Sequence, residues 1–340
     1  MLIPVLQMSA GLVMLFLGGE MLVRGAVAFA HKCGMSALSI GLTIVAFATS
    51  APELAVSVSA ALDGASAIAV GNVVGSNIAN IGLILALSAL IQPMVVENKV
   101  LKVDASIMLG CVALICVFLV DWYISRVEGI LLSAGIAGYV LFTLWDARRH
   151  PEPIADDLDV TGATTAKPLY VDILLFLAGL AILVGGGKVL VLGAISIAEQ
   201  LEISQAVIGL TIIAVGTSLP EMATSLIAAM RGYSSMAIGN IIGSNIFNTL
   251  GILGVTALVQ PLDAGAIGWT DLGTMALISV AMVLFLITRN LLDRKEGALL
   301  LVIYSAYTAW LALASRSGRR CYRRPGPDRK TGKAGLLTLS

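Results

Sequence analysis

Residues 41–93 read GLTIVAFATSAPELAVSVSAALDGASAIAVGNVVGSNIANIGLILALSALIQP, and residues 209–261 read GLTIIAVGTSLPEMATSLIAAMRGYSSMAIGNIIGSNIFNTLGILGVTALVQP. The two stretches align without a gap, and 29 of their 53 positions are identical. The identities include Thr, Ser, Pro, Glu, Asn and Gln in register, which chance matching between two apolar segments would not produce. Self-similarity at a fixed offset, here 168 residues, indicates a duplicated structural unit.

The composition of the chain is that of a membrane protein. Apolar residues make up 58% of the 340 residues and charged residues only 12%, against roughly a quarter in soluble domains. Apolar runs of about 18 residues or more recur along the chain, as in spanning helices, whereas barrel strands would be short and alternating. Basic and acidic residues balance at 21 each with no basic stripe, so nothing indicates nucleic acid binding. We expect an all-α polytopic membrane protein with the lipid bilayer as its partner.

About ten spanning helices are predicted from the apolar runs, five in each half. An odd number of spans per repeat requires the second copy to enter the membrane from the opposite side, as in the inverted repeats of many secondary transporters. The predicted spans are roughly 4–30, 36–62, 67–91, 105–122 and 127–146, then 169–198, 204–230, 236–260, 270–288 and 294–315.

The two repeats are expected to be joined and followed by polar segments. Residues 147–168 contain prolines and an acidic group, which is typical of a linker, and residues 316–340 are basic and Gly-containing, as in disordered tails. The predicted organisation is a first repeat over 1–146 with its motif at 41–93, a linker over 147–168, a second repeat over 169–315 with its motif at 209–261, and a tail over 316–340.

Each motif places one carboxylate in the middle of a predicted span. Glu53 ends the sequence Thr-Ser-Ala-Pro-Glu, and Glu221 ends Thr-Ser-Leu-Pro-Glu. A charge at this depth costs about 3 kcal/mol on insertion scales, so an ionisable residue there is a functional hypothesis by default. The preceding proline has no N–H and leaves carbonyls without helical partners. Helices broken in this way at membrane depth surround cavities or ion sites.

The next helix of each half adds polar side chains four residues apart and therefore on one helical face. Together with the glutamates and the Thr-Ser hydroxyls they form a set of hard oxygen donors, which suits Ca²⁺ or Na⁺ rather than zinc, copper or iron. Such a site would hold one Ca²⁺ or about two to three Na⁺ in competition. No resident cofactor is expected, because these ions are cargo. The side chains are Thr49, Ser50, Asn72, Ser76 and Asn80, and Thr217, Ser218, Asn240, Ser244 and Asn248.

Both TSxPE segments and both GNxxGSNIxN segments resemble the two alpha-repeats of the calcium/cation antiporter superfamily, the sodium/calcium exchangers, in their compact prokaryotic form. The resemblance covers about residues 10–315. It implies a ten-helix inverted repeat in the inner membrane of a prokaryote that exchanges Na⁺ for Ca²⁺ by alternating access, with the first and sixth helices sliding across the core. It also implies that Glu53 and Glu221 bind both ions and that Asn80 supplies an amide. The implied sodium ligands are Thr49, Ser50, Ser76, Thr217, Ser218 and Ser244, with the backbone carbonyls of Ala46 and Ala214.

The chain departs from the family pattern at Asn248, where some members, including potassium-dependent exchangers, carry Asp. Without that third carboxylate, potassium dependence is disfavoured and the number of sodium ions stays open.

A cation/proton antiporter is the main alternative, in which Glu53 and Glu221 would alternate between protonation and metal binding. The hydroxyls and amides beside each glutamate favour Na⁺, because protons need only the carboxylates. An intramembrane hydrolase with two carboxylates as acid and base does not explain the inverted repeat. A channel is disfavoured because deep paired carboxylates would bind a divalent ion tightly and slow its escape. We therefore expect a transporter and not an enzyme.

Overall fold

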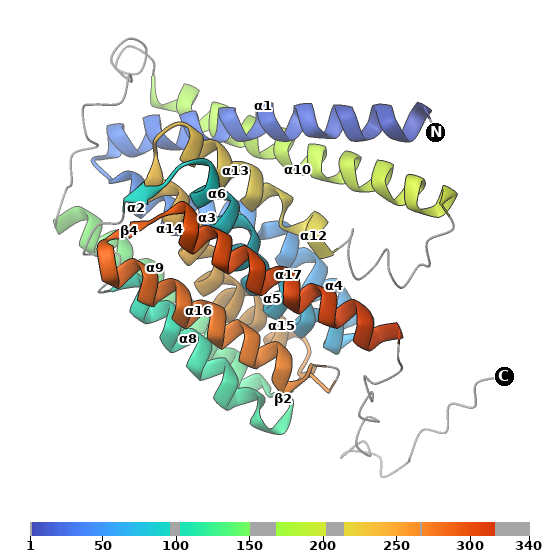
Figure 1. The fold of residues 1–340 in the computed structure, drawn as a ribbon. Coiled ribbons are helices and arrows are strands. Elements are labelled where there is room, and N and C mark those ends of the chain that lie inside the picture. Colours follow the sequence, from blue (N-terminus) through green and yellow to red (C-terminus); the bar gives the residue numbers. More distant parts are fainter. Residues whose placement is uncertain (1, 96–102, 150–167, 202–213, 266, 317–340) are drawn as a thin grey trace.

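The computed structural model describes residues 2–95, 103–149, 168–201, 214–265 and 267–316. These residues are almost entirely helical, and a long pair of helices, α1 and α10, runs across the outside of the other helices (Figure 1). The start of the second motif, most of the predicted linker and the predicted tail lie outside the described residues.

The first half begins with one long helix and is divided into shorter pieces through the motif. Its α-helices are α1 (Leu2–Cys33), α2 (Ala37–Ile40), α3 (Ala46–Thr49), α4 (Ala51–Leu62), α5 (Ser66–Ala79), α6 (Ala86–Ile91), α8 (Asp104–Phe118) and α9 (Arg126–Arg149). Two π-helical turns, η1 (Gly41–Val45) and η2 (Asn80–Leu85), and one 3-10 turn, η3 (Leu119–Asp121), connect some of them. The short strands are β1 (Met94–Val95) and β2 (Tyr123–Ile124).

The second half repeats this order. Its α-helices are α10 (Leu169–Gln200), α12 (Ala214–Thr217), α13 (Leu219–Met230), α14 (Ser234–Ile246), α15 (Leu253–Val259), α16 (Trp269–Arg289) and α17 (Arg294–Arg316). A π-helical turn, η5 (Phe247–Ile252), joins α14 to α15. The strands are β3 (Leu262–Asp263) and β4 (Leu291–Leu292).

The predicted membrane architecture is confirmed in the described part of the chain. Eight helical segments there are long and apolar enough to span a membrane, and the bent pair Ala37–Thr49 and Ala51–Leu62 makes a ninth. The remaining predicted span, 204–230, begins outside the described residues, and its later part forms α12 and α13. The helix α9 continues to Arg149, three residues into the segment predicted as a linker.

The break expected in each motif lies at its proline. Helix α3 ends at Thr49, α4 begins at Ala51, and the two are bent by 42°. Pro52 sits in the first turn of α4, where its missing N–H is tolerated, but a straight helix cannot pass through it. Helix α13 begins in the same way, with Pro220 in its first turn.

Glycine residues let α1 and α10 touch backbone to backbone. They recur every seven residues on both helices. A Cβ on Gly18 would lie 2.6 Å from the Leu183 backbone nitrogen, and one on Gly11 would lie 2.6 Å from that of Leu190. Since the partner number falls as the α1 number rises, the helices are antiparallel. They are corresponding helices of the two repeats, so their opposite directions are those of an inverted repeat.

Several smaller features obey the same pseudo-two-fold relation. Strand β1 pairs with β4 through Met94 and Leu292, and β2 pairs with β3 through Ile124 and Leu262. These two pairs exchange when 168 is added to the first-half positions. The left-handed backbone at Trp122 is likewise repeated at Asn290. The halves are therefore interleaved, and each completes small sheets with the other.

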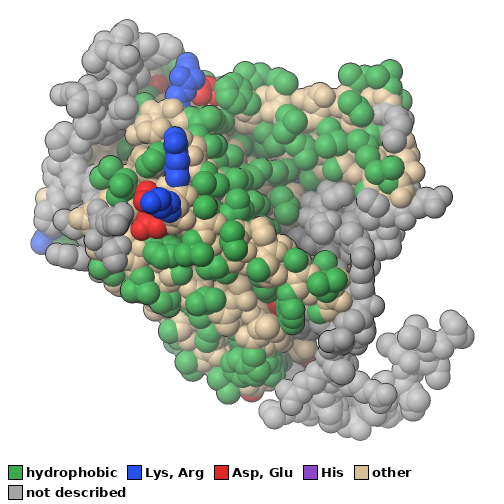
Figure 2. Space-filling model, viewed as in Figure 1, with side chains coloured by type: hydrophobic (Ala, Val, Ile, Leu, Met, Phe, Trp, Pro, Cys, Tyr) green, Lys and Arg blue, Asp and Glu red, His purple; other side chains and the backbone are tan. Residues whose placement is uncertain are grey.

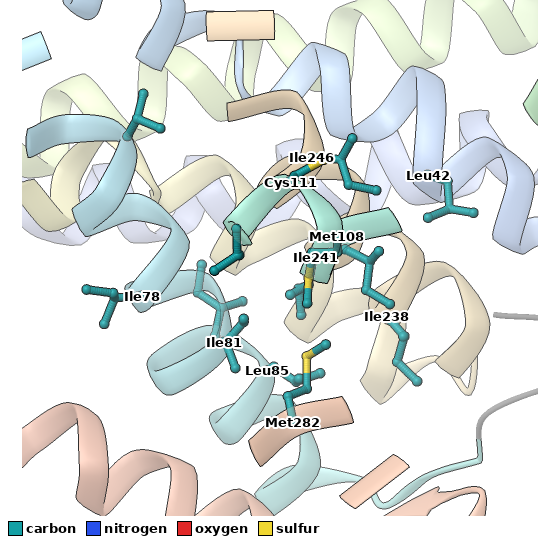
Figure 3. Packing of buried hydrophobic residues seen from close by; sticks show 14 of the residues in the cluster. Leu42, Ile78, Ile81, Leu85, Met108, Cys111, Ile238, Ile241, Ile246 and Met282 are labelled. Atoms are coloured by element: carbon teal, nitrogen blue, oxygen red, sulfur yellow. The ribbon is translucent and has the colours of Figure 1, made fainter. Parts of the chain in front are cut away.

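The centre of the bundle is formed by the helices that follow the glutamates. In the most apolar 18-residue windows of Ser66–Ile91 and Ser234–Val259, 72% and 83% of the residues are buried, against 28% in the corresponding window of α1. Large aliphatic side chains such as Ile78, Ile81 and Ile241 fill the space between them (Figure 3). The face drawn in Figure 2 is mostly hydrophobic, with few charged side chains among the described residues. Such a surface matches a surrounding bilayer.

Candidate functional site

Glu53 and Glu221 lie in the first turns of α4 and α13 and are almost completely buried, at 1% and 2% exposure. Their positions follow from the broken helices, because each carboxylate comes directly after the new helix begins. The positive end of a helix dipole favours a carboxylate in the first turn. Each helix therefore presents its acidic group from an N-terminus in the middle of the bundle.

Serine residues hold each glutamate from the opposite repeat. Ser50 and Ser218 occupy the N-cap positions of α4 and α13, yet neither side chain caps its own helix. Ser50 Oγ donates to Glu221 Oε1 over 3.0 Å, and Ser218 Oγ donates to Glu53 Oε1 over 3.3 Å. These crossed hydrogen bonds bring the two predicted carboxylates into one site.

The polar stripe of α5 reaches the glutamate pair at Ser76. Ser218 Oγ also lies 3.4 Å from Ser76 Oγ, a contact that connects α5 to the glutamate pair. Asn80 lies one turn beyond Ser76, at the start of the π-helical turn η2. Ser244 and Asn248 hold the corresponding places in α14 and η5, and all four are buried. π-Helical turns are found frequently at functional sites.

Five buried oxygens of the predicted ligands have no hydrogen-bond partner in the described structure. An unsatisfied buried polar group costs about 1–3 kcal/mol and more when charged, so such a group calls for an explanation. All five are hard donors from residues predicted to bind a cation. They are Glu53 Oε2, Glu221 Oε2, Asn80 Oδ1, Asn248 Oδ1 and Ser244 Oγ.

The ion pairs of the described residues lie away from the two glutamates. Arg24 and Arg231 both pair with Glu20, and Lys32 pairs with Asp172. Ser50 and Ser218, which donate hydrogen bonds to the two glutamates, carry no charge. Two buried carboxylates without a basic partner are costly, and a bound cation is one way to offset that cost.

The upstream ligands predicted from the resemblance are placed less symmetrically. Thr49 Oγ1 donates a hydrogen bond to the Val45 carbonyl at 3.0 Å and lies 3.4 Å from Asn240 Oδ1. The Ala46 carbonyl accepts the Ser50 N–H at 3.0 Å.

In the second repeat the Ser218 N–H donates to the Val215 carbonyl at 3.1 Å. Val215 directly follows Ala214, the counterpart of Ala46. Thr217 ends α12, one residue before Ser218.

The first members of the stripes brace helices together. Asn72 Nδ2 donates to Ser57 Oγ at 3.0 Å, and Asn240 Nδ2 donates to Ser225 Oγ at 2.9 Å. Ser57 and Ser225 were not among the predicted site residues. They are identical in the two motifs and follow the glutamates by four residues, which is the signal that would have found them.

Comparison with known proteins agrees with this geometry. The sodium/calcium exchanger protein family matches residues 3–145 and again residues 171–313, at the same 168-residue offset. The chain is 36% identical over 332 residues to the sodium/calcium exchanger MaX1 of Methanosarcina acetivorans, covering 87% of this chain and 95% of that protein. It is 33% identical over 322 residues to the inner membrane protein YrbG of Escherichia coli, covering 92% and 97%.

Solved structures of the sodium-calcium exchanger NCX_Mj have the same fold. One, soaked with 10 mM Na⁺ and 10 mM Sr²⁺, matches with a TM-score of 0.80 at 33% identity, over 91% of this chain and 98% of that chain. Family, fold and paired repeats agree over nearly the whole length. The chain belongs to the sodium/calcium exchanger protein family and is an integral membrane cation antiporter.

Proposed function

We propose that the protein exchanges Na⁺ for Ca²⁺ by alternating access, with the ions bound between Glu53 and Glu221. One observation carries the proposal. Each buried carboxylate is held at one oxygen by a serine of the other repeat, and its second oxygen is left without a partner. Two such oxygens, with the unpaired amide oxygens of Asn80 and Asn248, supply the charge and the hard donors that Ca²⁺ prefers.

Competition for these oxygens would couple the two fluxes. A Ca²⁺ ion balances both carboxylates at once, whereas Na⁺ ions would share them and take further oxygens from the neighbouring hydroxyls. Ser50 is hydrogen-bonded to Glu221, and Ser218 contacts both Glu53 and Ser76, so these hydroxyls are within reach of the same ions. This density of hydroxyl groups supports Na⁺ coupling over proton coupling, for which the carboxylates alone would suffice.

The direct test is Ca²⁺ uptake into proteoliposomes. Vesicles loaded with Na⁺ are diluted into Na⁺-free buffer that contains ⁴⁵Ca²⁺, using the wild type, Glu53→Gln and Glu221→Gln. Asp121→Asn is a matched control, because this carboxylate is exposed and its hydrogen bond to the Tyr123 N–H is one that an amide can keep.

We expect Ca²⁺ uptake to require the Na⁺ gradient and both glutamates, and to be unaffected by Asp121→Asn. Uptake that ignores Na⁺ but follows an imposed proton gradient would replace the proposal by a cation/proton antiporter with the same glutamates. Equal uptake by the wild type and both glutamine variants would reject the site itself.

The proposal includes the inner membrane of a prokaryotic cell as the location. It is supported by the apolar outer face of the bundle and by the name of the similar Escherichia coli protein. Fractionation of a cell that expresses the tagged chain tests this point.

A further inference from the structure

Four buried asparagines form two crossed pairs between the repeats. Asn80 Nδ2 donates to Asn245 Oδ1 at 3.0 Å, and Asn248 Nδ2 donates to Asn77 Oδ1 at 3.1 Å. Asn80 and Asn248 keep an unpaired amide oxygen, whereas Asn77 and Asn245 sit one helical step off the predicted ligand stripe. From the sequence, Asn77 and Asn245 are expected only to hold helices together.

The direction of the pair between Asn77 and Asn248 is determined by Thr249. The Thr249 hydroxyl donates its one hydrogen to the Asn245 backbone carbonyl at 2.9 Å, and a carbonyl can only accept. The Thr249 oxygen must therefore accept the second contact, from Asn77 Nδ2 at 2.9 Å. Asn77 is then obliged to turn its oxygen toward Asn248, and Asn248 must offer its N–H.

The pair between Asn245 and Asn80 is oriented by sulfur. Asn245 Nδ2 lies 3.7 Å from Met108 Sδ, and a thioether accepts hydrogen bonds weakly and cannot donate them. The Asn245 oxygen consequently faces Asn80. The position equivalent to Thr249 in the first repeat is Ile81, so this half lacks the hydroxyl.

We propose that Asn77 and Asn245 are positioning residues that hold the amides of Asn248 and Asn80 with their oxygens, and not their N–H groups, toward the transported cation. The inference rests on the proposed function, since it assigns a direction to two of the proposed ligands. A flipped amide would aim two N–H donors at a cation. The orientation of Asn248 is fixed more strongly than that of Asn80, because Asn77 is held by the Thr249 hydroxyl, itself bonded to the Asn245 carbonyl, whereas Asn245 is held by the Met108 thioether.

Thr249→Val tests this role, because valine keeps the shape of threonine and removes the hydroxyl. We expect the Ca²⁺ concentration for half-maximal uptake to rise about tenfold, the lower end of the range for residues that orient metal ligands, with a smaller change in maximal rate. Thr249→Ser should restore the wild-type value. Met108→Leu is the matched variant in the other half and should change the Ca²⁺ dependence less.

An unchanged half-saturating concentration in Thr249→Val, with wild-type exchange otherwise intact, would overturn the inference. So would a fall in maximal rate alone that Thr249→Ser fails to reverse, because that pattern reports packing. Neither result touches the proposed function, which fails only if the wild type shows no Na⁺-driven Ca²⁺ uptake or if the glutamine variants retain it.

A second inference rests on the ion pairs of α1, a separate part of the molecule. Glu20 contacts Arg231, at the end of α13, over 2.7 Å. At the 168-residue offset, Lys188 is the counterpart of Glu20, and Asp63 is the counterpart of Arg231. The repeat relation therefore offers a second pair at the same two positions, with the charges reversed. Lys188 and Asp63 are exposed, and no ion pair joins them in the described part of the chain.

The packing around the two positions is also unequal. A Cβ on Gly19 of α1 would lie 2.5 Å from Ile227 Cδ1 of α13, so α1 is pressed against that helix. The equivalent Gly187 of α10 faces Leu219, again on α13, and not α4. At these two positions the helices α1 and α10 therefore pack against α13 and not against α4.

We infer that the two charge pairs are alternative latches: Glu20 with Arg231 holds the α1 and α10 pair against α13, and Lys188 with Asp63 holds it against α4 in the other state of access. In an inverted repeat, the second state is the first with the environments of the two repeats exchanged.

Disulfide trapping in vesicles tests this inference, in a background without the native cysteines. Glu20→Cys with Arg231→Cys and Lys188→Cys with Asp63→Cys are each treated with a mild oxidant. Both pairs should cross-link, and each bond should stop transport until it is reduced. Cross-linking of the first pair alone, in protein that still transports, would overturn the inference, and this readout does not depend on which ion is carried.

Discussion

Ser50→Ala is expected to weaken the Na⁺ dependence of exchange strongly. Ser50 is 1% exposed and donates to Glu221 Oε1 over 3.0 Å, so alanine removes both a proposed sodium ligand and a side-chain hydrogen-bond donor to that carboxylate. A hydrogen bond to a charged group contributes about 1.5–3 kcal/mol. At about 1.4 kcal/mol for each factor of ten, the Na⁺ concentration for half-maximal exchange should rise about 10- to 100-fold.

The assay measures ⁴⁵Ca²⁺ uptake while the Na⁺ inside the proteoliposomes is varied, and then while external Ca²⁺ is varied. The Ca²⁺ dependence should move less than the Na⁺ dependence, because both carboxylates remain for the divalent ion. Ser59→Ala is the control, an exposed serine on the same helix α4. An unchanged Na⁺ dependence in Ser50→Ala would refute the reasoning, and unchanged uptake driven by a proton gradient would favour the cation/proton alternative.

Three further predictions concern the helix seam, the missing carboxylate and the outer ion pairs. Gly18→Ala places a methyl group 2.6 Å from the Leu183 nitrogen, so it should destabilise the protein by about 1–3 kcal/mol, whereas Gly138→Ala enters open space; thermal unfolding compares them. Asn248→Asp adds a third carboxylate to the site and should tighten Ca²⁺ binding, as measured by isothermal titration. Lys32→Gln leaves Asp172 buried without its partner and should lower the unfolding temperature more than Arg24→Gln, whose pair is exposed.

The duplication made much of the architecture predictable from the sequence. A gapless offset relates each position of one half to a position of the other, so one observation about Glu53 is also one about Glu221. The odd number of spans predicted opposite directions for corresponding helices, and the antiparallel contact of α1 with α10 agrees with it. The positions of the helix breaks could be predicted from the prolines, because a proline disrupts helical hydrogen bonds only near itself.

The contacts across the repeats could not be predicted in the same way. Helical periodicity places Ser50 near Glu53 on one helix, but it says nothing of Glu221, which accepts the Ser50 hydrogen bond from 171 residues away. The same limit applies to Glu20, whose local partner Arg24 follows from a spacing of four residues while Arg231 does not. The orientation of the Asn77 amide depends on Thr249. The equivalent residue of the first repeat is isoleucine, so comparison of the two repeats does not single out this position.

The distribution of strong contacts limits how access to the site can change. Buried hydrogen bonds tie the repeats together around the glutamates, among them those from Ser50, Ser218, Asn80 and Asn248 to side chains of the opposite repeat. Rocking one half against the other would break them, at about 1–3 kcal/mol for each group left unsatisfied. The pair of α1 and α10 instead meets the core through apolar side chains, such as Leu15 and Leu22, and a partly exposed ion pair. A movement of this pair over a fixed core therefore costs less than a movement between the halves.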